Sequence, residues 1–149
     1  MAITAAGLLL PPSMPAQTPA SVVSSSLQDL HRRINVHREA AGCRPLAWHE
    51  GAARVAESHS TDMSRRDYFD HRNPEGMEVG GRLLAGGVTW HGLAGENIAL
   101  TAAGPEVVID LWVDSPPHRE NMEECAFTHH GLGVYRDRWT QVLVERPGR

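Results

Sequence analysis

The hydrophobic pattern of this chain changes its period along the sequence, and this change constrains the fold more than any other feature. Between residues 25 and 66, apolar side chains recur every three or four positions, a spacing typical of helices. From Gly131 to Tyr135 and from Trp139 to Val144, β-branched and aromatic residues are enriched, which is typical of strands. Helices must therefore pack on a small sheet, and 149 residues suffice for one such domain.

The first 24 residues differ in composition from the rest of the chain. They are rich in Pro, Ala, Ser and Thr and show no periodicity, and the apolar stretch from Ala2 to Leu10 resembles the end of a secretory leader. We expect residues 1–24 to be a leader followed by a disordered linker, and residues 25–149 to be the folded domain. Ser25 and Gln28 form a capping-box pattern at the predicted start of the first helix. We expect the protein to be secreted.

Glycine and proline mark the ends of the other predicted elements. A second helix runs from Glu50 to Arg66, and one face of it carries a stripe predicted to be buried: Ala52, Ala56, His59 and Met63. A short helix covers residues 82–84, and another begins at Pro105 and stops before Pro116. Residues 95–100 form a third strand, and residues 136–138 turn between the two C-terminal strands. The predicted class is α+β, with helices flanking a small antiparallel sheet.

The charge of the chain excludes some classes of partner. Fourteen Lys and Arg against 18 Asp and Glu give a net charge of −4, so there is no basic footprint for nucleic acid. No apolar run is long enough to cross a bilayer as a helix. We therefore expect no nucleic-acid partner and no transmembrane segment, and we expect a monomer.

The two cysteines, Cys43 and Cys125, lie far apart in the sequence and next to the ends of predicted elements. Such a pair either forms one bridge across the domain or remains as two small buried thiols. The even count and the leader-like N-terminus favour a disulfide, because exported proteins fold in an oxidising environment. A bridge would also exclude cysteine-protease chemistry.

Four segments, taken in order, resemble the bacterial branch of the CAP superfamily, which comprises cysteine-rich secretory proteins, antigen 5 and pathogenesis-related 1 proteins. They are REAAGCRPLAW with AESHSTDM (38–63), YFDH (68–71), GENIA (95–99), and LWVDSPPHRENM (111–122) followed by FTHHGLGV. The resemblance implies an α-β-α sandwich with a central antiparallel sheet. It also implies a surface cleft lined by two histidines and two acidic residues.

Matched residue by residue, the resemblance places the cleft histidines at His71 and His118 and one cleft carboxylate at Glu96. The position of the fourth cleft residue is occupied by Ser115, and Asp114, one residue earlier, is the alternative. The local sequence supports His118 independently, because Ser115 and Pro116 are typical of the first positions of a helix. The positive end of that helix would favour a neutral imidazole. The competing interpretation is a surface histidine bonded to Asp114 or to Glu120.

Two functions follow from this constellation. The first is a non-catalytic binding module that requires no cofactor and whose cleft takes a divalent cation, a small apolar ligand or a protein partner. Zn²⁺ or another divalent cation would be held by His71 and His118 with help from Glu96. The second is a hydrolase, metal-dependent or serine-type, that uses the same cleft. His59 is expected to be structural, and six histidines show no partner pattern: His31, His37, His49, His91, His129 and His130.

Overall fold

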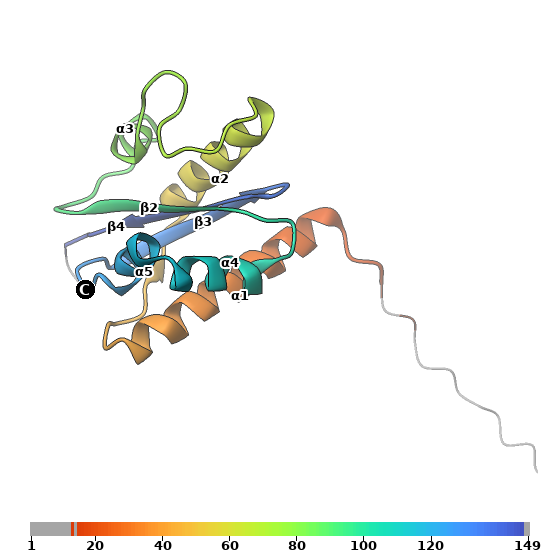
Figure 1. The fold of residues 1–149 in the computed structure, drawn as a ribbon, viewed down its shortest axis with the longest axis horizontal. Helices are drawn as coiled ribbons and strands as arrows, with labels where there is room; N and C mark the ends of the chain where they lie inside the picture. Colours follow the sequence, from red (N-terminus) through yellow and green to blue (C-terminus); the bar gives the residue numbers. More distant parts are fainter. Residues whose placement is uncertain (1–12, 14, 148–149) are drawn as a thin grey trace, which may run out of the picture.

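The computed structural model describes residue 13 and residues 15–147, and their elements form three layers. The sheet order is β1-β3-β4-β2, and Figure 1 shows α1, α4 and α5 on one face and α2 and α3 on the other. This is the predicted α-β-α sandwich. The helices are α1 (Pro19–Ala40), α2 (Glu50–Arg65), α3 (Val79–Ala85), α4 (Pro105–Asp114) and α5 (Pro116–Glu123); the strands are β1 (Ala47–Trp48), β2 (Ala94–Leu100), β3 (His129–Tyr135) and β4 (Arg138–Val144).

Helix α1 begins earlier than the sequence predicted. Its N-cap is Thr18, whose side-chain oxygen accepts a hydrogen bond from the backbone N–H of Ser21 at 3.2 Å, and Pro19 is the first helical residue. The predicted start at Ser25 is therefore wrong, and residues 19–24 are the first turns of the helix rather than linker. These turns are exposed, so they carry no apolar stripe that periodicity could detect. The leader-like residues 1–12 lie outside the described part of the chain.

The three predicted strands are present as β2, β3 and β4, which pair antiparallel, while β1 pairs parallel with β3. The sheet is therefore mixed. Strand β1 was not predicted because two residues are too few to show a period. The tight connection between β3 and β4 contains Arg136, which takes the left-handed conformation with φ 55°.

Helix α2 packs directly on the sheet, and its predicted stripe is buried. The close approach depends on glycines in β3: a Cβ atom at Gly131 would lie 1.9 Å from the backbone nitrogen of Ala53, and one at Gly133 would lie 2.2 Å from that of Glu57. The second helical layer packs on the other face through a larger apolar cluster that includes Leu30 and Trp112.

Two features hold the loop that follows α5 against the end of α1 and the turn after it. Cys43 and Cys125 form the predicted disulfide, with their Cα atoms 5.0 Å apart, which is within the usual range for a bridge. The buried Arg38 donates hydrogen bonds to four carbonyl oxygens, those of Arg44, Met122, Glu124 and Phe127. No helix among the described residues is long and apolar enough to cross a membrane.

Candidate functional site

The edge strand β2 carries a buried carboxylate, that of Glu96. Its Oε1 accepts a hydrogen bond from Nδ1 of His71 at 2.9 Å, and its Oε2 accepts one from Nη2 of Arg82 at 2.6 Å. A buried charge is strongly destabilising unless it is paired, and these two contacts supply the partners. The sequence analysis identified Glu96 and His71 but did not identify Arg82.

His71 lies in the loop between α2 and α3, and its side chain is 52% exposed. The hydrogen bond to Glu96 raises the pKa of His71 above its ordinary value, although burial opposes this. Arg82 also holds the loop, because its Nη1 donates to the carbonyl oxygens of His71 and Met77 at 2.9 and 2.8 Å. Since Nδ1 faces Glu96, Nε2 is the ring nitrogen that remains for a ligand.

His118 lies in the first turn of α5, as predicted. Ser115 is the N-cap residue and Pro116 the first helical residue, but the Ser115 side chain makes no capping bond. Its Oγ instead lies 2.7 Å from Nδ1 of His118. Burial lowers the pKa of His118, and the nearby positive charge of His71 lowers it further. Both effects favour the neutral form of the imidazole, which is also the form that the helix end is expected to favour.

The two candidates for the fourth cleft position have different surroundings. Ser115 is half-buried and contacts His118, whereas Asp114 is exposed at the end of α4. Of the two candidates, Ser115 is therefore the one that contacts His118. The interpretation of His118 as a surface histidine bonded to Asp114 or Glu120 is not what the structure contains.

The segments that carry His71 and His118 contact β2 from opposite sides, because consecutive strand residues point to opposite faces of a sheet. Glu96 faces Arg82 of α3, while Asn97 faces α5 and donates from Nδ2 to the carbonyl oxygen of His118 at 3.1 Å. Strand β2 thus positions His71 from one face and His118 from the other. Asn97 is fully buried, so its side chain holds the strand to α5 from within the core.

His59 lies buried behind the site on α2. Its Nε2 donates to the carbonyl oxygen of Asp70 at 2.9 Å and lies 3.8 Å from Oε1 of Glu96. Burial lowers the pKa of His59, so the ring is neutral and supports the loop from inside. His59 therefore holds Asp70, the residue before His71, in position, and its own buried side chain is not exposed to solvent.

The donor set at this site fits a metal ion only in part. Within the described residues there is no group of three or more His, Cys, Asp or Glu side chains placed to hold one. Both oxygens of Glu96 already face Arg82 and His71, so Glu96 acts as the partner that orients His71 rather than as a direct ligand. The remaining donors are the two imidazoles.

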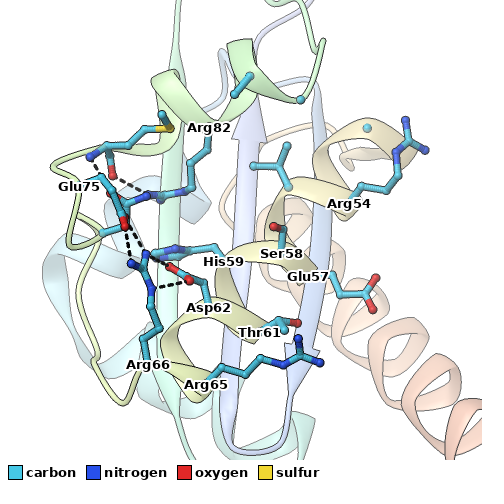
Figure 2. A pocket seen from close by; sticks show the side chains of 16 residues that line it. Arg54, Glu57, Ser58, His59, Thr61, Asp62, Arg65, Arg66, Glu75 and Arg82 are labelled. Carbon is cyan, nitrogen blue, oxygen red and sulfur yellow. Dashed lines mark hydrogen bonds and ion pairs between the residues drawn. The ribbon is translucent and has the colours of Figure 1, made fainter.

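A broad cavity of about 990 Å³ opens beside the site, along the outer face of α2. Figure 2 shows the guanidinium of Arg66 between the carboxylates of Asp62 and Glu75, so charged pairs form part of its wall. The lining includes His59 and Arg82 but neither His71 nor His118. The histidine pair and this cavity therefore do not coincide.

Comparisons with known proteins identify the family of this chain. The model of the cysteine-rich secretory protein family matches residues 31–144. The Bacillus subtilis protein YkwD is 32% identical over 126 residues, which are 83% of this chain and 49% of YkwD. A crystal structure of an extracellular SCP-domain protein from Bacillus anthracis superposes with a TM-score of 0.82 at 32% identity, covering 89% of this chain and 45% of that one.

A more distant match shows the fold alone: an outer surface protein from Borrelia burgdorferi has a TM-score of 0.76 at 16% identity and covers 83% of this chain and 95% of that one. The chain spans about half the length of the curated relatives that it matches. The family match covers most of the sequence and includes the positions of His71, Glu96 and His118. The chain belongs to the cysteine-rich secretory protein (CAP) family.

Proposed function

We propose that the protein is an exported binding module whose cleft holds a divalent cation, such as Zn²⁺, through Nε2 of His71 and Nε2 of His118. One observation carries the proposal: each imidazole has its Nδ1 engaged by a partner, the carboxylate of Glu96 or the hydroxyl of Ser115. Metal-binding histidines almost always have such a partner on the other ring nitrogen, because it fixes the tautomer and the ring orientation.

Two protein ligands leave coordination positions open. Such a site binds a cation weakly and reversibly, and the open positions can accept water or an oxygen of a further ligand. The same cleft could therefore recruit a protein partner or a small apolar ligand with one polar group. The cation would supply a positive charge that attracts such a group.

Export is supported by three observations. The disulfide between Cys43 and Cys125 is typical of proteins that fold in oxidising compartments. The matched family is described as secretory, and the similar Bacillus anthracis protein is described as extracellular.

A serine hydrolase is the second candidate, and the 2.7 Å contact between Ser115 and His118 favours it. A triad would also need an acid that orients the imidazole through its other nitrogen. The described residues include no carboxylate bonded to Nε2 of His118, and the binding function is therefore preferred. Turnover of a peptide or ester that is lost on His118→Ala would establish the hydrolase instead.

Calorimetry with Zn²⁺ near pH 7.5 tests the binding function. We expect the wild type to bind and the His71→Ala/His118→Ala double variant not to bind. Ser115→Ala should weaken binding by about tenfold, since it removes the partner that orients His118. Asp114→Asn is the matched control and should bind like the wild type, because Asp114 is exposed and outside the pair. Equal binding by the double variant and the wild type would refute the proposal.

The affinity should also depend on pH. The metal requires neutral imidazoles, so protons compete with it. The pKa of His71 is raised above its ordinary value of 6.5. As the pH is lowered from 7.5, the affinity should therefore start to decrease before pH 6.5 is reached, and it should decrease further in more acidic solution. Repeating the titration at several pH values measures this dependence, and a constant affinity between pH 7.5 and 5.5 would contradict it.

A further inference from the structure

A row of buried polar side chains crosses the sheet on the face covered by α1, α4 and α5. Each of three neighbouring strands contributes one residue: His130 from β3, Gln141 from β4 and Asn97 from β2, and all three are fully buried. Nε2 of Gln141 lies 3.1 Å from Nδ1 of His130, and its Oε1 lies 3.0 Å from Nδ2 of Asn97. The strands therefore carry one continuous hydrogen-bonded chain.

This hydrogen-bonded chain of side chains has one end at each edge of the sheet. On the β1 side, Nε2 of His130 lies 2.6 Å from Nδ1 of His31 on α1. On the β2 side, Nδ2 of Asn97 donates to the carbonyl oxygen of His118, and Oδ1 of Asn97 accepts from Nδ2 of Asn121 at 3.0 Å. His31 is thus connected to the backbone of a cleft residue on the far side of the domain.

The side-chain donors and acceptors determine which atom donates at each hydrogen bond along this row of residues. Asn97 uses its two N–H groups toward Gln141 and His118, so Oε1 of Gln141 accepts and its Nε2 donates. Nδ1 of His130 must then accept, and His130 carries its proton on Nε2 and donates it to Nδ1 of His31. A neutral His31 consequently carries its own proton on Nε2.

We propose that this chain couples the protonation of His31 at one edge of the sheet to the position of His118 at the other. A second proton on His31 must go to Nδ1, the atom that accepts from His130. Two N–H groups would then face each other across 2.6 Å. The contact is restored only if His130 moves its proton to Nδ1, and that step requires Gln141 and Asn97 to turn their amides in sequence. Asn97 would then present its oxygen to the carbonyl of His118 and release it. Its Nδ2 would at the same time face Nδ2 of Asn121, so the Asn121 amide must also turn or give up its bond to Asn97.

Several groups surround the ring of His31, whose protonation starts the proposed change. The rings of His31 and Trp48 lie nearly perpendicular, with centroids 5.8 Å apart. Nδ2 of Asn35 lies 3.5 Å from Nε2 of His31, but it donates to the nearer carbonyl oxygen of Leu46 at 3.1 Å, so it does not need the ring as an acceptor. Gln28 and Glu50 line the same cavity of about 390 Å³, and Glu50 accepts from the Trp48 indole. Burial lowers the pKa of His31, so the ring is neutral at pH 7 and takes up a proton in more acidic solution.

His130, the partner of His31, resists taking up a second proton. Burial lowers the pKa of His130 well below its ordinary value, and the positive charges of His31, Arg38 and His129 lower it further. His130 therefore passes on the change at His31 and does not itself take up a proton. The coupling does not depend on what the cleft binds.

Nuclear magnetic resonance of the isotopically labelled protein without added metal tests the coupling. Long-range ¹H–¹⁵N spectra at pH 7.5 should show His130 protonated on Nε2. On titration to pH 5, the side-chain amide signals of Asn97 and Gln141 should shift with the same midpoint as the His31 ring, below pH 6.5. In His31→Gln, whose side-chain oxygen can still accept from His130, this titration should be lost. It should persist in His91→Gln, a matched change at an exposed histidine.

Three results would overturn the proposal. They are His130 protonated on Nδ1 at pH 7.5, Asn97 and Gln141 signals that stay fixed while His31 titrates, or an unchanged titration in His31→Gln. The first two are measured on the wild type, so the test remains decisive if the variant does not fold. Failure of the Zn²⁺ calorimetry would leave this result unaffected, because no metal is present.

Discussion

Replacing Gly131 by alanine is expected to lower the free energy of unfolding by about 3 kcal/mol or more. The added Cβ would lie 1.9 Å from the nitrogen of Ala53 and 2.3 Å from the carbonyl carbon of Ala52. These are backbone atoms of α2, so no side chain can turn aside, and the helix itself must move off the sheet. Since α2 also carries Ala56 and Met63 into the core, that movement disrupts packing well beyond the site of substitution.

Urea unfolding followed by circular dichroism measures this effect. Gly80→Ala is the matched control, because the nearest atom to its added Cβ is 3.9 Å away. Gly80 lies within α3, where alanine is the better helix former, so the control should be stabilised by about 0.5–1 kcal/mol. A Gly131→Ala protein within about 1 kcal/mol of the wild type would show that α2 does not lie this close to β3.

Removing the disulfide by Cys43→Ser/Cys125→Ser is expected to lower the free energy of unfolding by about 4 kcal/mol. The bridge joins residues 82 apart in sequence, so it greatly restricts the unfolded chain. The native loop should keep its position at equilibrium, because Arg38 still donates to the carbonyl oxygens of Met122, Glu124 and Phe127. We therefore expect a less stable protein with a native-like near-ultraviolet spectrum.

Denaturant melts of the double variant and of the reduced wild type measure the loss of stability. The two should agree, since both remove only the bridge. Alkylation without reductant provides the control and should label neither cysteine of the oxidised protein. Two thiols that are readily alkylated in the protein purified under oxidising conditions, or melts unchanged by reduction, would contradict the account.

The parts of this fold that the sequence predicted are those with a local cause. The stripe of α2 repeats at helical spacing, and Val142 and its neighbours in β4 belong to an apolar run bounded by a turn. The helical position of Ser115 and Pro116 also follows from capping preferences of single residues. The family resemblance, rather than periodicity, selected His71, Glu96 and His118.

The parts that were missed depend on contacts between distant residues. Glu96 required a cation, but 14 Lys and Arg residues were available, and Arg82 shares no local pattern with it. His31 and His130 are 99 residues apart, and only the packing of α1 on β3 brings them together. Strand β1 and the exposed first turns of α1 lack periodicity altogether, so no hydrophobic pattern could reveal them.

Long-range ¹H–¹⁵N spectra of the labelled protein during a Zn²⁺ titration near pH 7.5 test the proposed binding function most directly. The structure has Nδ1 of His71 at Glu96 and Nδ1 of His118 at Ser115, so the cation should reach only the opposite nitrogen of each ring. We predict that the Nε2 signals of both histidines move to positions typical of metal-bound nitrogen while both Nδ1 atoms stay protonated. Metal-induced changes at Nδ1, or at His37 and His91 instead of the cleft pair, would contradict the proposal.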